Sequence, residues 1–364
     1  MPRGETSTVA DGLDSVVAAE TVLSRVDGEA GVLILRGHTL QEIAGHRSFE
    51  WLTGLLWQDF VPRPLDEAAL RRDLGQARVR AFGAMQDLLP MAGRLPPLAA
   101  VRLLLAAVPD DAEDAPLLLT ATVAVGLAAA IRIRDGRAPV PPDPLAGHAA
   151  DVLRMLKGTP PAPEEAAALD TYLVTAADHG LNASTFTARV AASTRASLTD
   201  AVTAALCALK GPLHGGAPGP VLDMLDAIGP AENAEAWLDA AVMRGDRLMG
   251  FGHRVYRVQD PRSDVVKSVV ERLHRDIGRL RYAEAVEQAA LAVLVKRKPN
   301  RSLQTNLEFY TALLLEALGL PRDGFTGAFA VARVVGWIAH ALEQQARGRL
   351  IRPQSVYVGP MPEA

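Results

Sequence analysis

Apolar residues recur at three- and four-residue intervals through most of the chain, which is the spacing of the buried face of an α-helix. Segments with this periodicity cover 65–89, 98–107, 117–131, 164–177, 184–210, 234–243, 264–278 and 283–295. Only 22–26 and 32–35, joined by Asp27-Gly28, read as a β-hairpin. No strands alternate with helices, so the pattern predicts a mostly α fold with a small N-terminal β-hairpin and argues against a doubly wound sheet.

Composition and charge narrow the class of protein. The apolar stretch 115–131 is short for a membrane span and contains Pro116, so we expect a buried core helix. Lysines and arginines number 38 against 42 acidic residues, a net charge of −4 that argues against a nucleic-acid partner. Cys207 is the single cysteine, which excludes an intramolecular disulfide. The first residues lack the apolar core of a secretory signal, and we expect a cytoplasmic protein.

Three histidines stand beside glycines at widely separated positions: Asp178-His179-Gly180, Leu213-His214-Gly215 and Gly252-His253. A single histidine of this kind is more often a core residue or a helix cap than a ligand contact. Three in similar settings, one of them followed by Asp260-Pro261-Arg262, favour a ligand site. Dinucleotide, P-loop, zinc-protease and serine-esterase motifs are missing from the sequence.

Taken together, these motifs resemble the citrate synthase family. The matching runs are 178–185, 213–217, 250–256 with 260–262, and 329–340 with 350–353, within a likeness from about 16 to 360. The resemblance implies an all-helical fold of two domains, a large one from 1–212 and 326–364 and a small one from 213–325. The active site would lie in the cleft between them, with the glycine-rich run 211–219 near a hinge.

The resemblance also implies an activity and a role for each matching residue. Family members condense oxaloacetate with acetyl-CoA and hydrolyse the citryl thioester, a reaction of the tricarboxylic acid cycle that needs no metal or further cofactor. His214 would hydrogen-bond the thioester carbonyl, His253 would polarise the ketone, and Glu308 would be the base. Oxaloacetate would be bound by His179, Asn182, Arg262, Arg333 and Arg352. Coenzyme A would lie near Leu213, Met249, Gly250, Gly252, Arg257 and Asn306.

Arg352 corresponds to an arginine that enters the site from the partner subunit in the family. A homodimer is therefore implied, without a hexameric arrangement and without a membrane partner. Two-fold symmetry would make each subunit supply this residue to the other.

One position departs from the family. The chain reads Asn306-Leu307-Glu308-Phe309-Tyr310, and Glu308 stands where the family has its catalytic aspartate. The preceding segment, 298–305, also lacks the usual Tyr-Pro spacing. One extra methylene adds about 1 Å of reach, and a misplacement of about 1 Å can cost roughly 100-fold in rate.

Two interpretations of Glu308 stay open. Either the backbone is set back and Glu308 abstracts the proton, or the site is slow or adapted to another substrate. Two alternatives to citrate formation follow: 2-methylcitrate synthesis from propionyl-CoA, which differs from acetyl-CoA by one methylene, and a non-catalytic binding homologue.

Overall fold

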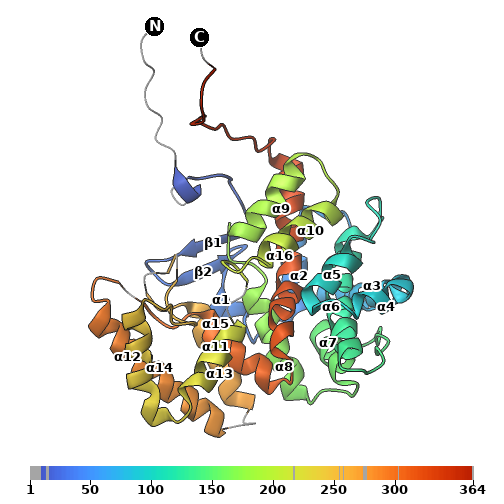
Figure 1. Ribbon diagram of the computed structural model, residues 1–364. Helices are drawn as coiled ribbons and strands as arrows, with labels where there is room; N and C mark the ends of the chain where they lie inside the picture. The colour runs from blue at the N-terminus through green and yellow to red at the C-terminus, as the bar shows by residue number, and fades with distance from the viewer. Residues whose placement is uncertain are drawn as a thin grey trace.

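The computed structural model describes residues 10–13, 16–215, 218–253, 255–256, 258–273, 277–301 and 303–362. Helices dominate these residues, with a small sheet at one side (Figure 1), so the predicted mostly α class is confirmed. The strands are β1 Ser24–Asp27, β2 Val32–Leu35 and β3 His38–Thr39. The α-helices are α1 Leu40–Ile43, α2 Phe49–Trp57, α3 Glu67–Ala84, α4 Leu89–Ala92, α5 Pro97–Leu105, α6 Ala115–Arg134, α7 His148–Lys157, α8 Pro163–Ala176, α9 Ala183–Ser193, α10 Leu198–Leu209, α11 Pro218–Ile228, α12 Ala234–Arg244, α13 Pro261–Leu273, α14 Ile277–Arg297, α15 Leu307–Ala317 and α16 Phe325–Arg347. Short 3₁₀ helices are η1 Asp11–Leu13, η2 Gln86–Leu88, η3 Ala231–Asn233 and η4 Arg322–Gly324.

The predicted hairpin is present and has a third strand beside it. β1 pairs antiparallel with β2, with Asp27 opposite Val32, and β2 pairs with β3. The connecting loop runs from 28 to 31, and Asp27 Oδ1 closes it by accepting a hydrogen bond from Ala30 N at 2.9 Å. β3 is too short for an alternating pattern to predict it.

The tip of the hairpin touches the loop that follows α12. A Cβ atom at Gly28 would lie 2.3 Å from the carbonyl oxygen of Val255. A second loop residue, Gly31, has a φ of +65°, and a Cβ there would meet the side chain of Val258 at 2.8 Å. Only glycine permits both approaches, so the hairpin supports the chain directly after His253.

Periodicity predicts one helix over 184–210, and the structure has two. α9 ends at Ser193 and α10 begins at Leu198. Arg195 lies between them with a positive φ of 66°, a conformation that a right-handed helix does not contain. Ser197 then caps α10 by accepting a hydrogen bond from Asp200 N at 3.0 Å. The Ser-x-x-Asp sequence is the local sign of a new helix that the periodicity hides.

The bounds of two further predicted helices also differ. The segment 264–278 covers the end of α13 at Leu273 and the start of α14 at Ile277. The predicted helix over 65–89 ends early, because α3 stops at Ala84 and η2 follows. In each case the apolar spacing in the sequence continues past the residue at which the first helix ends.

Two apolar helices form the centre of the core. The helical stretches 115–134 and 322–347 are long and apolar enough to cross a membrane, but their most apolar windows are 78% and 83% buried inside the protein. α6 packs against α3, α5, α7 and α16, and α16 packs against α9, α10 and α8. The expected core helix at 115–131 is therefore confirmed as part of α6.

The helices between 213 and 325 gather on one side of the molecule (Figure 1). α12 packs on α14, while α11 and α13 pack on α15. α13 also packs against α8, which belongs to the predicted large domain. The division into 1–212 with 326–364 and 213–325 stays a prediction that this packing is compatible with.

Candidate active site

The turn between α8 and α9 carries two of the predicted oxaloacetate ligands. Gly180, at a φ of 80°, reverses the chain after His179. Asn182 caps α9, because its Oδ1 accepts hydrogen bonds from the backbone N–H groups of Ser184 and Thr185, each at 3.1 Å. The amide Nδ2 of Asn182 lies 3.4 Å from His179 Nε2. The cap therefore positions His179 relative to the start of α9.

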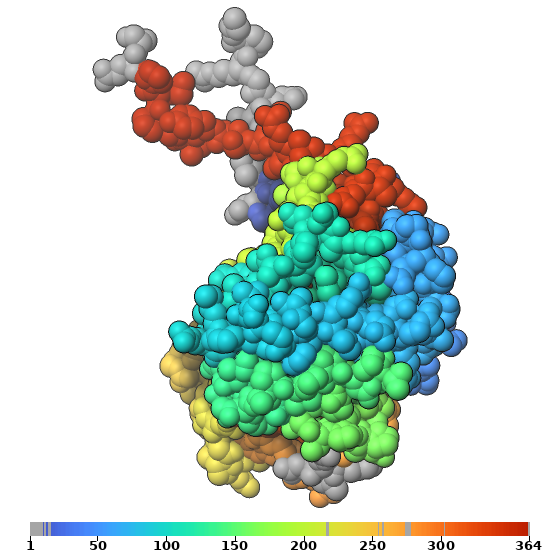
Figure 2. Space-filling model, turned by 90° about the vertical axis from the view of Figure 1, so that its right-hand side faces the viewer, coloured from blue at the N-terminus to red at the C-terminus, as the bar shows by residue number. Residues whose placement is uncertain are grey.

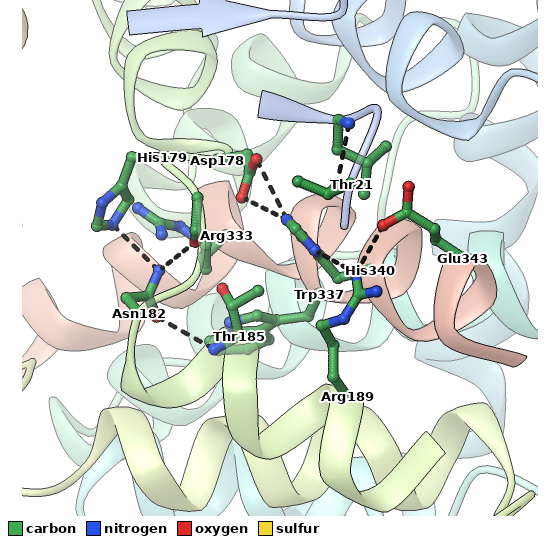
Figure 3. Close-up of polar contacts among 12 residues, drawn as sticks. Thr21, Asp178, His179, Asn182, Thr185, Arg189, Arg333, Trp337, His340 and Glu343 are labelled. Carbon is green, nitrogen blue, oxygen red and sulfur yellow. Dashed lines mark hydrogen bonds and ion pairs between the residues drawn. The ribbon is translucent and has the colours of Figure 1, made fainter. Parts of the chain in front are cut away.

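Arg333 lies beside this turn on α16, as Figure 3 shows. It is fully buried, and its Nε donates to the carbonyl oxygen of Ala176 at 2.7 Å. Its Nη1 and Nη2 have no hydrogen-bond partner among the described residues. Burial lowers the pKa of Arg333 to about 9. A buried guanidinium with an unsatisfied outer edge is costly, so this edge fits an anion that offers two oxygens.

A buried polar network lies behind Arg333. His340 Nδ1 accepts a hydrogen bond from Arg189 Nη1 at 3.0 Å, so its Nε2 carries the proton and donates to Asp178 at 3.4 Å (Figure 3). Arg189 also pairs with Glu343 at 2.6 Å. Burial raises the pKa of Asp178, but His340 and then Arg333 outweigh it and keep the pKa below its usual value. Asp178 is thus a buried negative charge that partly balances Arg333.

His214 lies in the glycine-containing segment that follows α10, and its ring contacts the start of α9. Its Nε2 lies 2.8 Å from Ser184 Oγ and 3.3 Å from Ser184 N. Trp337 Nε1 donates to the same hydroxyl at 3.1 Å. A backbone N–H directed at Nε2 requires Nε2 to accept, which leaves the proton on Nδ1. His214 Nδ1–H is therefore the donor available to a ligand.

His253 is held with the opposite tautomer. Its Nδ1 accepts hydrogen bonds from the backbone N–H groups of Val255 and Tyr256, each at 3.0 Å. The proton is then on Nε2, and Nε2 lies 3.1 Å from Arg262 Nη2. Two N–H donors face each other here and cannot satisfy one another. A ligand oxygen within hydrogen-bond distance of both His253 Nε2 and Arg262 Nη2 would accept from both groups.

Arg262 starts α13 and is anchored by Asp260. Asp260 accepts from Arg262 Nε at 2.9 Å and from Nη2 at 2.8 Å, and both residues are buried. Asp260 also accepts from Leu307 N at 3.2 Å, at the first turn of α15. This ion pair raises the pKa of Arg262 against the effect of burial and joins the His253 loop to the helix that carries Glu308.

Glu308 is partly buried in the first turn of α15. Burial raises its pKa, and Arg262 is the largest opposing influence. In the described chain its carboxylate makes no hydrogen bond or ion pair with another residue. Glu308 is thus an available carboxylate close enough to Arg262 for the two charges to interact.

The loop 250–252 is fastened to the residues just before α15. Gly252 N donates to Gln304 O at 2.8 Å, and Asn306 N donates to Gly250 O at 2.9 Å. Asn306 also donates its side-chain Nδ2 to Gly252 O at 2.8 Å. Gly250 has a φ of 86°, and a Cβ there would lie 2.9 Å from Phe309. The predicted coenzyme A loop and the predicted base are therefore parts of one rigid unit.

These groups converge on His179. Burial lowers the pKa of His179 well below 6.5, and Arg333, Arg262, His253 and His214 lower it further in that order. Burial also lowers the pKa values of His214 and His253 to about 4. The three imidazoles are consequently neutral at pH 7 and act as hydrogen-bond groups rather than cations. Among the described residues, no group of three or more His, Cys, Asp or Glu side chains is placed to hold a metal ion.

Some predicted residues do not join this cluster. Arg352 lies exposed in the segment after α16, which leaves the body of the molecule as an extended arm (Figure 2). Leu213 is 96% exposed and Met249 is partly buried. Arg257 lies outside the described residues. The roles of these four residues stay predictions.

Two residues of the cluster were not among the predicted site residues. Ser184 supports His214, and Asp260 anchors Arg262. Both occur inside motifs that the sequence makes visible, Asn182-Ala183-Ser184 and Asp260-Pro261-Arg262. A polar residue two positions from a predicted ligand was the sign that could have indicated them.

Comparison with known proteins points to one family. The chain matches the family model described as citrate synthase, C-terminal domain, over residues 12–354. It is 38% identical to a putative citrate synthase 2 of Mycobacterium tuberculosis over 97% of this chain and 94% of that protein. It is also 38% identical to the citrate synthase of Haloferax volcanii over 96% and 95% of the two chains.

Solved structures of citrate synthases have the same fold as this chain. The crystal structure of citrate synthase from Thermotoga maritima gives a TM-score of 0.86 at 31% identity, covering 98% of both chains. A ternary complex of carboxymethyl coenzyme A and oxaloacetate with citrate synthase from Thermoplasma acidophilum gives 0.87 at 26% identity, also covering 98% of both.

Proposed function

Because the chain belongs to the citrate synthase family, we propose that the cluster around His179 is the site where it condenses oxaloacetate with acetyl-CoA. The products after hydrolysis of citryl-CoA are citrate and coenzyme A. In this proposal the residues have separate roles: the arginines hold the keto-diacid, two histidines donate hydrogen bonds, and Glu308 moves the proton.

The observation that carries the proposal is the pairing of two buried arginines at one place. Arg262 and Arg333 are both buried, and each lowers the pKa of the same imidazole, His179. Arg262 also helps to lower the pKa of Arg333. Asp260 binds Arg262 through Nε and Nη2, but Nη1 and Nη2 of Arg333 have no hydrogen-bond partner among the described residues, so the two guanidinium groups together still favour an anionic ligand. Oxaloacetate supplies two carboxylates and, between them, a ketone oxygen for the N–H donor of His253.

Enolisation is the first chemical step. The Glu308 carboxylate takes a proton from the methyl carbon of acetyl-CoA, the C–H electrons form the C=C bond of an enolate, and the C=O electrons move to the thioester oxygen. The thioester oxygen receives the hydrogen bond from His214 Nδ1–H, which is neutral at pH 7 because its pKa is about 4. A fixed donor in a buried site stabilises the charge that develops on that oxygen.

Carbon–carbon bond formation follows. The enolate carbon attacks the ketone carbon of oxaloacetate, the thioester C=O bond re-forms, and the electrons of the ketone C=O bond move to the ketone oxygen. His253 Nε2–H and Arg262 Nη2 donate toward that oxygen, since the two nitrogens lie 3.1 Å apart. Water then cleaves the thioester. We place coenzyme A along the loop 250–252, which Asn306 holds against the start of α15.

The direct test is thiol release from acetyl-CoA in the presence and absence of oxaloacetate, with citrate identified by mass spectrometry. We expect release that depends on oxaloacetate and a higher kcat/KM with acetyl-CoA than with propionyl-CoA. Binding of oxaloacetate in calorimetry without any thiol release from either thioester would overturn the proposed activity.

We further propose that the enzyme works as a homodimer in which Arg352 completes the partner's site. The arm that carries Arg352 exposes several apolar side chains, among them Val356, Tyr357 and Val358, the last 92% exposed. Such a stretch is stable in water when another surface covers it. The arm also extends away from the helical body of its own chain (Figures 1 and 2).

Mixed dimers test the origin of Arg352. We expect Arg352→Gln and Glu308→Gln subunits, each nearly inactive alone, to regain roughly one quarter of the parent activity when they are unfolded and refolded together, since random pairing leaves one intact site in half of the dimers. That site combines Glu308 of one subunit with Arg352 of the other. If Arg352 acted within its own subunit, no pairing would restore an intact site, and the mixture would stay inactive.

A further inference from the structure

A buried carboxylate on α14 lies directly behind the helix that carries Glu308. Glu287 is 6% exposed. Its Oε1 accepts a hydrogen bond from Thr305 Oγ1 at 2.6 Å, and its Oε2 accepts one from the Tyr310 hydroxyl at 2.5 Å. Thr305 precedes Glu308 by three residues and Tyr310 follows it by two. Glu287 therefore binds the chain on both sides of Glu308.

The same carboxylate has a cationic neighbour. Lys267 Nζ on α13 lies 3.4 Å from Glu287 Oε2 and 5.2 Å from the ring centre of Tyr310. It also lies 3.6 Å from Glu284. A buried carboxylate that accepts two hydroxyl hydrogen bonds and faces an ammonium group is well satisfied. Glu287 is therefore held in a fixed position and links α13, α14 and α15.

Glu287 is also linked, through Thr305, to the loop that precedes His253. Thr305 forms an isolated antiparallel bridge with Phe251, and the next residue, Asn306, donates to Gly252 O. Glu287 thus fixes, through Thr305, the strand-like segment on which both the 250–252 loop and the start of α15 rest.

We propose that Glu287 is a positioning residue for the reaction, and that its contacts with Thr305 and Tyr310 set where the Glu308 carboxylate lies. The proposal rests on the proposed function, in which Glu308 is the base. Glu308 has no hydrogen bond or ion pair to another described residue that would hold its side chain, so its position depends on the helix backbone. Proton abstraction is sensitive to a displacement of about 1 Å.

Three single variants remove the contacts with little change of volume. Thr305→Val and Tyr310→Phe each delete one hydroxyl donor, and Glu287→Gln weakens both bonds. We expect kcat to fall about 10-fold in each single variant and about 100-fold in Thr305→Val/Tyr310→Phe, while KM for both substrates stays within about twofold, because the interaction acts on the chemical step. Thr305→Ser keeps the donor and should restore the parent kcat.

Glu284→Gln is the matched control. Glu284 is on the same helix, contacts the same Lys267 and loses the same charge, but no hydrogen bond joins it to Thr305, Tyr310 or another described residue near Glu308. We expect its kcat and KM to equal those of the parent. Thermal unfolding of every variant shows whether it folds, and calorimetry with oxaloacetate shows whether the binding cluster is intact.

The Glu308→Gln background separates positioning from general damage. If Glu287 acts through Glu308, Glu287→Gln should not lower the small residual rate of Glu308→Gln any further, because the effects of residues that act as a unit do not add. An additive loss, a rise in KM alone, or a parent kcat in folded Thr305→Val and Glu287→Gln would overturn the inference. Full activity of Glu308→Gln alone would instead overturn the assignment of the base in the proposed function.

Discussion

We expect the Glu308→Gln enzyme to form citrate about 1,000-fold more slowly than the parent, because a positioned general base contributes roughly 10²- to 10⁴-fold to the rate. Glutamine keeps the size and the hydrogen-bonding ability of the side chain but cannot accept the proton. Affinity for oxaloacetate should change little, since Arg262 and Arg333 remain. The measurement is kcat for thiol release, with oxaloacetate affinity from calorimetry.

The pH dependence gives a second view of the same carboxylate. Burial raises the pKa of Glu308, and only the ionised form can act as base, so kcat should fall as the pH is lowered through that raised pKa. His214 and His253, with pKa values of about 4, are still neutral over most of this range. The acid limb of the parent should disappear in the residual activity of Glu308→Gln.

Glu308→Asp distinguishes the two interpretations of this position. If the backbone is set for glutamate, shortening the side chain by one methylene should lower kcat by up to roughly 100-fold. A faster aspartate variant would instead mean that the glutamate had impaired an ancestral site. Unchanged activity of the glutamine variant would show that another group takes the proton.

For Arg333→Met we expect a loss of oxaloacetate affinity of roughly 30- to 4,000-fold, from the 2–5 kcal/mol that truncating one partner of a buried charge pair costs. At the same time the ligand-free protein should unfold at the same temperature as the parent or higher. Arg333 is buried with Nη1 and Nη2 unpaired, and replacing such a charge by an apolar side chain removes a desolvation cost. Calorimetry and thermal unfolding measure the two effects.

Arg78 provides the contrasting control. It is also fully buried, but Asp151 binds its Nε at 2.7 Å and the carbonyl oxygen of Ala146 binds its Nη2 at 2.7 Å. Arg78→Met breaks the fully buried half of this network and leaves Asp151 only its contacts with Arg154 and the backbone of Asp143, so it should destabilise the fold by up to about 3–5 kcal/mol without a direct effect on oxaloacetate affinity. If Arg333→Met behaved like Arg78→Met, Arg333 would be a structural residue and its assignment to oxaloacetate would be wrong.

Most of the cluster could be predicted because its motifs are local. Each of four site residues stands in a short run with glycine, proline or a helix-capping residue: His179, His214, His253 and Arg262. Such runs can be recognised from the sequence alone. What the sequence could not supply is the state of each group. The tautomers of His214 and His253 follow from hydrogen bonds to Ser184, Val255 and Tyr256, which depend on the folded backbone.

Glu287 shows the other limit. It lies in the predicted helix 283–295, where a glutamate followed by a glutamine reads as a solvent-facing residue. It is buried because Thr305 and Tyr310 of a distant segment turn their hydroxyls toward it. Helical periodicity likewise predicts neither α15 nor α16. Most positions of both helices are buried, so apolar and polar residues do not alternate at the spacing that marks an amphipathic helix.

The contact between Gly28 and Val255 ties one catalytic imidazole to the beginning of the polypeptide. The peptide between Val255 and Tyr256, whose N–H donates to His253 Nδ1, has its carbonyl group against the tip of the β1–β2 hairpin. Shortened forms that begin after this hairpin would therefore be expected to fold around their helical core yet lose the orientation of that ring. In directed evolution, position 28 should tolerate no side chain even though it lies far from the substrates in the amino-acid order.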